Sequence, residues 1–154
     1  MVVKGKSFLF NILVPLAIGL ISELIALPFL SDYAELNLPR GAPTILVSTI
    51  VWIFVFILMG IASYLVFSSK QKNIGLPFWI YYIQLAFVFF WPIFFYHAQF
   101  HLFSIIWIFL ELLFSFFAIF TFSRIRKLAG LIMIPCFIWI SFLAYVTIGV
   151  FVLN

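Results

Sequence analysis

Three of the five tryptophans in this sequence, Trp52, Trp91 and Trp139, lie well inside long apolar stretches. An indole ring presents a flat aromatic face together with one polar N–H group, so it can stack on a flat hydrophobic ligand. Trp79 differs, because it follows Pro77 near the start of such a stretch, where tryptophan is typical of a membrane-interface anchor. The chemistry indicated first is therefore recognition of an aromatic ligand.

Each of the three deep tryptophans belongs to a row of large side chains with helical spacing. Positions i, i+4, i+7 and i+11 lie on one face of a helix. The rows are Trp52, Phe56, Met59 and Ser63; Gln84, Val88, Trp91 and Phe95; and Pro135, Trp139, Phe142 and Val146. We expect these faces to point inward and line a common site, although the same spacing also suits bulky core residues of a helix bundle.

Glu23 and Glu111 are carboxylic acids inside the apolar stretches. A carboxylate at the centre of a bilayer costs about 2.5 to 3.5 kcal/mol on insertion scales, so we expect Glu111 to face inward and to be protonated or paired. No lysine or arginine lies inside these stretches to pair with either acid. Each acid is either a ligand or proton site, or a polar group satisfied by packing.

Patterns of classical catalysis are absent. His97 and His101 have a spacing that suits a metal or an axial haem ligand on a helix, but we interpret residues 97–101 as a turn and predict no metal site. The sequence has no G-x-S-x-G elbow, no phosphate loop and no Cys–His pair. These absences exclude an ATP-driven or classical hydrolytic role for this chain alone.

The composition makes lipid the solvent of this chain. Of its 154 residues, 68% are hydrophobic and 8% are charged, whereas a soluble domain is about a quarter charged. A spanning helix takes about 20 residues. Five apolar stretches are long enough, at about 8–30, 44–67, 77–96, 102–123 and 129–152. We predict an all-α membrane protein, with residues 1–154 forming a single transmembrane domain of five bundled helices.

The basic residues fall on one side of such a bundle. With five spans, the N-terminus and segments 68–76 and 124–128 lie on the same side of the membrane. The opposite side holds a single basic residue, Arg40. The first side holds seven: Lys4, Lys6, Lys70, Lys72, Arg124, Arg126 and Lys127. Lysine and arginine are in excess in cytoplasmic loops. We therefore predict a multi-pass protein of a bacterial cell membrane, with its N-terminus cytoplasmic and its C-terminus outside. The net charge of +4 reflects this bias and indicates no nucleic-acid partner.

Segment 31–43 is the longest connection, and it contains Pro39, Gly41 and Pro43. Prolines limit flexibility, so the segment can be ordered while lacking regular structure. Long ordered loops over a helical bundle are often lids. We interpret this helix 1–2 loop as a lid over the tryptophan faces, and a plain linker is the alternative.

Several motifs together resemble one family. They are Pro39 and Ala42-Pro43 ahead of Trp52, the run LMGIASYLV at 58–66, WPIFF at 91–95 and PCFIWISFLAYV at 135–146. With these motifs on five spans in the same order, the chain resembles the tryptophan-rich sensory protein/translocator protein family (TspO/MBR), and the spacing from the prolines to Trp52 is one residue longer here. The resemblance covers nearly the whole chain.

The resemblance implies a five-helix bundle that binds tetrapyrroles such as protoporphyrin IX or haem, with no obligatory cofactor, between the bundle and the helix 1–2 loop. It also implies light-dependent porphyrin breakdown at Trp52 and Trp139, and a tendency to form homodimers. The predicted ligand-binding residues are Pro39, Pro43, Trp52, Phe56, Met59, Gln84, Val88, Trp91, Phe95, Pro135, Trp139 and Phe142.

This chain departs from the family pattern at several polar positions. The helix-3 Asn and Ser of the family are Val88 and Pro92 here, and the helix-5 Tyr is Cys136. Glu111 lies about one turn from the position of the family's helix-4 Asp, near Trp107. We therefore expect a pocket less polar than those of relatives.

Two other functions remain as alternatives to a tetrapyrrole-binding sensory or translocator protein. One is a small transporter of an apolar metabolite, with Glu23 and Glu111 coupling it to protons. The other is a regulatory partner of another membrane protein, docked through the small residues Gly19, Ser22 and Ala26.

Overall fold

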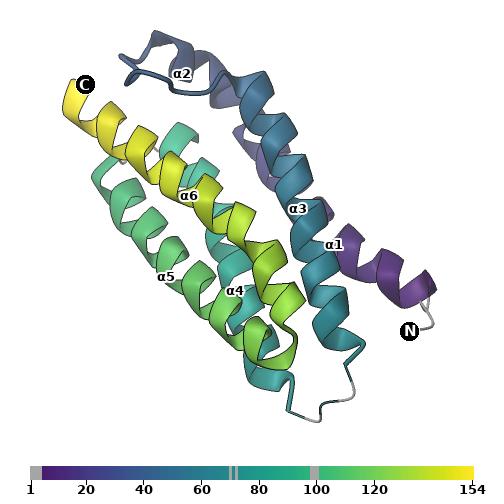
Figure 1. The fold of residues 1–154 in the computed structure, drawn as a ribbon. Helices are drawn as coiled ribbons and strands as arrows, with labels where there is room; N and C mark the ends of the chain where they lie inside the picture. The colour runs from purple at the N-terminus through teal and green to yellow at the C-terminus, as the bar shows by residue number, and fades with distance from the viewer. Residues whose placement is uncertain (1–4, 70, 72, 98–100) are drawn as a thin grey trace.

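A computed structural model describes residues 5–69, 71, 73–97 and 101–154 (Figure 1). For Ser31, Asp32, Ala34 and His97 it describes the backbone only. Lys4, Lys70 and Lys72, which contribute to the predicted charge asymmetry, lie outside the described residues, as does most of the predicted turn after His97.

Five long helices confirm the predicted fold class. They are α1 (Gly5–Ala26), α3 (Ile45–Phe67), α4 (Gly75–Pro92), α5 (His101–Ile125) and α6 (Lys127–Leu153). Three shorter elements extend them: the 3-10 turn η1 (Leu27–Phe29), the helix α2 (Leu30–Glu35) and the π-helical turn η2 (Ile93–His97). By length and hydropathy, all five long helices can cross a membrane, and the described residues contain no strand.

The five long helices form a closed ring. Helix α1 packs against α3 and α4, α3 packs against α6, and α5 completes the ring between α6 and α4 (Figure 1). The start of α1 and the α5–α6 connection lie at one end, and α2 and the C-terminus lie at the other. Lys6, Arg124, Arg126 and Lys127 thus lie at the end opposite Arg40, which agrees with the predicted separation of charge but does not show which end is cytoplasmic.

Short-range signals mark several helix boundaries. The Thr44 hydroxyl caps α3 by accepting a hydrogen bond from the backbone N–H of Val47 (3.4 Å). Pro92 is the last residue of α4 and has no N–H to donate to the carbonyl one turn earlier. The chain then continues as the π-helical turn η2. One extended residue, Arg126, separates α5 from α6.

Small residues allow close helix contacts. A Cβ at Gly60 would lie 2.6 Å from the Ile12 Cα, so α3 approaches the backbone of α1 there. On α1 itself, Ala26 is buried, and the buried Ser22 hydroxyl donates to the Phe89 carbonyl of α4 (2.6 Å). Ser22 and Ala26 of the small-residue row of α1 therefore pack within this chain, as small residues do between membrane helices.

The predicted loop 31–43 is partly helical, because α2 continues to Glu35 and leaves residues 36–44 as the connection. This corrects the expectation that the whole segment lacks regular structure. Tyr33 of α2 is buried, with its ring 6.1 Å from that of Phe95 and 5.4 Å from that of Tyr96. This tertiary contact anchors a helix that would be too short to be stable alone, and the same burial raises the pKa of the Tyr33 phenol.

Residues 36–44 lie over the C-terminal end of α6. The Tyr145 hydroxyl donates to the Arg40 carbonyl (3.1 Å), and the backbone N–H of Asn37 donates to Asn154 Oδ1 (2.9 Å). Gly41 has φ +79° in a turn closed by the bond from Ala42 N–H to the Pro39 carbonyl (3.1 Å), a position where glycine avoids strain. The segment is thus held to α6 by direct bonds.

Candidate functional site

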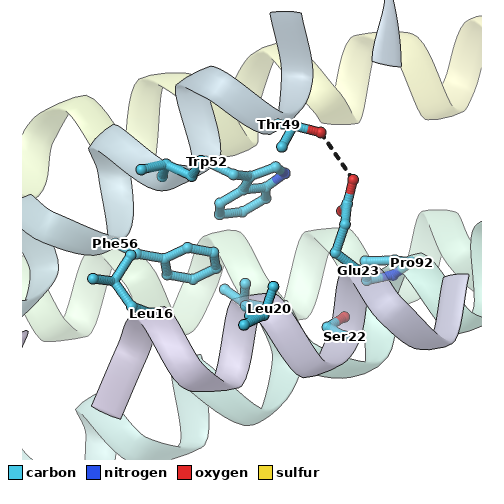
Figure 2. A pocket seen from close by; sticks show the side chains of 11 residues that line it. Leu16, Leu20, Ser22, Glu23, Thr49, Trp52, Phe56 and Pro92 are labelled. Atoms are coloured by element: carbon cyan, nitrogen blue, oxygen red, sulfur yellow. Dashed lines mark hydrogen bonds between the residues drawn. The ribbon is translucent and has the colours of Figure 1, made fainter. Parts of the chain in front are cut away.

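A cavity of about 290 Å³ lies between α1, α3 and α4 (Figure 2). Its lining is almost entirely apolar or aromatic, and one acidic side chain reaches it. The lining residues are Leu16, Gly19, Leu20, Ser22 and Glu23 of α1, Thr49, Trp52, Ile53 and Phe56 of α3, and Val88 and Pro92 of α4. Pockets of this kind, apolar with few polar groups, are typical small-molecule sites.

Two stacked rings form one wall of the cavity. Trp52 and Phe56 are one helical turn apart on α3, and their ring centroids lie 5.2 Å apart with an interplanar angle of 20°. Gly19 makes room on the facing helix, because a Cβ there would overlap the Phe56 ring. The result is an aromatic wall on α3 that faces α1 (Figure 2).

Trp52 also connects this wall to α6. The Trp139 ring meets the Trp52 ring edge-on, with centroids 6.5 Å apart and an interplanar angle of 89°. Edge-to-face contacts of this kind are favourable between aromatic rings. Trp139 itself does not line the cavity, so it supports Trp52 from behind.

The polar edge of the cavity is built by Glu23 and Thr49. The Thr49 hydroxyl donates to Glu23 Oε1 (2.9 Å), and this bond joins α1 to α3. Figure 2 shows the pair at the end of the cavity opposite Leu16 and Phe56. An acceptor that carries charge makes such a bond stronger than a neutral one, so the carboxylate is held in a defined position.

The access side of the cavity faces the membrane. Leu20 of α1 and Ile53 of α3 both line it, and they are 61% and 49% exposed on the outside of the bundle. Side chains in spanning helices that are exposed in this way contact lipid. The cavity is therefore open sideways, between α1 and α3.

A sequence profile of the TspO/MBR family matches residues 11–153. The chain belongs to the TspO/MBR family. This confirms the resemblance drawn from the proline, tryptophan and LMGIASYLV motifs, and it makes the chain a multi-pass integral membrane protein. A comparison with curated proteins finds no match.

The predicted site residues of this TspO/MBR protein are divided among separate places. Trp52, Phe56 and Val88 line the cavity. Trp91 and Phe95 stack on each other beside it, with centroids 4.9 Å apart. Their faces on α3 and α4 are buried as expected, but only part of that surface borders the cavity.

Met59 and Gln84 meet Cys136 in the centre of the ring. Gln84 Nε2 donates to Cys136 Sγ (3.5 Å), which lies 3.7 Å from Met59 Sδ. Glu111 is also buried here, 1% exposed, as expected for an inward-facing acid, and its Oε1 has no hydrogen-bond partner among the described residues. These side chains pack against one another and border no part of the cavity.

The expected face of α6 is buried only in part. Val146 is buried, whereas Pro135, Trp139 and Phe142 are half-buried. The most deeply buried side chains of this helix include Cys136, Ile140 and Thr147. The helix is apolar all round, and lipid is as apolar as the bundle core, so hydrophobic spacing does not identify its inner face.

The loop prolines lie apart from the cavity. Pro39 packs against α6, where a Cβ at Gly149 would come within 2.5 Å of the Pro39 Cγ. None of the side chains described in 31–43 lines the cavity, so the role of this segment as a lid stays a prediction. For metal ions, the described residues hold no group of three His, Cys, Asp or Glu side chains.

Sequence reasoning missed most of the α1 wall, including Leu16 and Leu20. The available signal was Gly19, one turn before Glu23, since a small residue lets a neighbouring helix or side chain approach closely. Thr49 also lies one turn ahead of Trp52 on the same face of α3.

Proposed function

We propose that this TspO/MBR protein binds a flat hydrophobic ligand of the tetrapyrrole class at the cavity between α1, α3 and α4. The observation that carries the proposal is the Trp52–Phe56 stack on the cavity wall. A flat macrocycle gains dispersion and stacking energy from such a surface without needing polar groups. Membership of the TspO/MBR family supports the choice of ligand class.

The size of the cavity suggests how such a ligand would sit. About 290 Å³ is near the lower end of the range for small-molecule pockets. A macrocycle would therefore insert one edge against Trp52 and Phe56. Its remainder would pass between Leu20 and Ile53 and rest against lipid.

The test is a titration of the purified protein in lipid nanodiscs with protoporphyrin IX, followed by the porphyrin absorbance and by tryptophan fluorescence. We expect saturable binding. Trp52→Phe should weaken the affinity about 3- to 10-fold, because it replaces the larger ring of the stack.

Trp79→Phe is the matched control. Trp79 is 71% exposed and lies outside the cavity, so its replacement removes one indole and leaves the affinity unchanged. Absence of saturable binding, or an equal loss in the two variants, would contradict the proposal.

Light-dependent porphyrin breakdown is a second candidate activity. The observation that favours it is the contact between Trp52 and Trp139. In its first step the excited macrocycle is reduced by one electron and the Trp52 indole is oxidised by one electron. The edge contact places a second oxidisable indole next to the first.

A further inference from the structure

One carboxylate stands on the wall of an otherwise apolar cavity. Glu23 lies at the end of the cavity that is nearer the C-terminal end of α1. From there the aromatic wall extends past Trp52 to Phe56 at the other end of the cavity (Figure 2). Among the described residues, the Thr49 hydroxyl supplies the hydrogen bond to this carboxylate, and it engages Oε1. The second oxygen, Oε2, keeps its capacity to accept.

Among the side chains that the structure describes, no positive one lines the cavity beside this group. None of the residues that line it is Lys, Arg or His. A carboxylate in apolar surroundings is costly unless it is paired. A ligand that carries a positive charge would supply the missing partner, whereas an anionic ligand group would be repelled.

The dimensions of the cavity define the rest of the ligand. Leu16 and Glu23 are seven residues apart on α1, which corresponds to about 10 Å at 1.5 Å per residue. A group bound at Glu23 therefore has room for one or two fused rings between it and Leu16, beside Phe56. A cation near the indole of Trp52 also gains cation–π attraction.

Access from lipid favours the same ligand class. The exposed Leu20 and Ile53 leave the cavity open between α1 and α3. An aromatic amine dissolves in a bilayer with its rings in the apolar region and its ammonium group towards the headgroups. Glu23 lies three residues before the end of α1, so it can meet the ammonium group near that depth.

We propose that Glu23, held by Thr49, selects ligands that carry a protonated amine on a flat apolar ring system, and that these ligands reach the cavity sideways from the bilayer. This inference rests on the proposed function, because it assumes that the cavity binds a ligand. It adds a charge preference. Protoporphyrin IX, whose propionates are anionic, would bind with those groups turned away from Glu23.

The test compares two probes that differ in one group, 2-(1-naphthyl)ethylamine and 2-(1-naphthyl)ethanol. Each is titrated calorimetrically into the protein in phosphatidylcholine nanodiscs, which carry no net charge, with empty nanodiscs as the blank. Hydrogen bonds to charged groups contribute about 1.5 to 3 kcal/mol, so we expect the amine to bind at least about tenfold more tightly than the alcohol.

Glu23→Gln keeps the shape of the side chain and removes its charge. We expect the amine-to-alcohol preference to fall to about one in this variant. Thr49→Val, which removes the hydrogen bond to Glu23, should reduce the preference in part. Glu35→Gln is the control, because Glu35 is an exposed acid on α2 outside the cavity, and there the preference stays as in the original protein.

The outcomes separate this inference from the proposed function. Equal binding of amine and alcohol to the unchanged protein, or a preference that survives Glu23→Gln, overturns the charge selection while protoporphyrin IX still binds. If neither probe nor protoporphyrin IX binds saturably, both the inference and the proposed function fail. A loss of preference in Glu35→Gln as large as in Glu23→Gln would also overturn the role of Glu23.

Discussion

Trp52 is the residue on which the proposed chemistry depends most. It stacks on Phe56, meets Trp139 edge-on and lines the cavity. The two contacts have separate roles, because Phe56 extends the surface on which a ligand lies and Trp139 lies behind Trp52. Replacing Trp139 should therefore affect photochemistry more than binding.

Trp139→Phe tests this separation. We expect the affinity for protoporphyrin IX to change by less than about threefold, because the contact with Trp52 remains aromatic. Under visible light, the loss of porphyrin absorbance should slow, because the second indole is gone. A dark sample of the same variant is the control. Breakdown at the unchanged rate would show that Trp139 takes no part in it.

Residue types and spacing predicted part of the site. The row of Trp52 and Phe56 could be derived from helical spacing, and the depth of Glu23 marked it as unusual. The stacking of the two rings could not be derived, because it depends on Gly19 of another helix. The separation of Met59 and Gln84 from the cavity depends in turn on contacts with Cys136 of α6.

At the scale of the elements, α1 and α3 form the frame of the cavity. They approach closely at Gly60, and near there the Ser63 hydroxyl donates to Asn11 Oδ1 (2.6 Å) with both side chains buried. Further along the same pair of helices, Thr49 bonds to Glu23. Two polar contacts thus fix how α1 lies against α3, where apolar surfaces alone give little preference.

Ser63→Ala removes one of these contacts. Hydrogen bonds between membrane helices contribute about 0.6 to 2 kcal/mol, so we expect the free energy of unfolding in detergent to fall by about that amount. Ser141→Ala is the matched control, because its exposed hydroxyl donates to the Phe137 carbonyl of its own helix (2.7 Å). The prediction fails if the two variants lose equal stability.

The short elements show where sequence patterns lose information. The five spans follow from hydropathy and length, whereas α2 does not, since six residues carry too few signals. Its position depends on Tyr33 packing against Phe95 and Tyr96 at the end of the distant third span. The predicted third stretch ran to residue 96, whereas α4 ends at Pro92 and the π-helical turn η2 follows it.

For the whole molecule, family and membrane class were predictable and the order of helices around the ring was not. All five spans have high mean hydropathy, and their few polar residues do not indicate which helices lie next to each other. The ring α1–α3–α6–α5–α4 places the cavity between α1, α3 and α4 and leaves α5 away from it. The side of the membrane on which each end lies, and homodimer formation, remain predictions.

Filling the cavity tests the central claim most directly. Gly19→Leu would place a side chain where the Phe56 ring now lies, so it both displaces this ring from the aromatic wall and occupies the cavity. Gly75→Ala is the control, because a Cβ at Gly75 meets nothing within 4 Å, and thermal unfolding checks that both variants fold.

We predict that Gly19→Leu lowers the affinity for protoporphyrin IX at least about tenfold, since the ligand loses its place against the aromatic wall, while Gly75→Ala binds as the unchanged protein does. A folded Gly19→Leu protein that binds protoporphyrin IX with unchanged affinity would contradict the assignment of the ligand to this cavity.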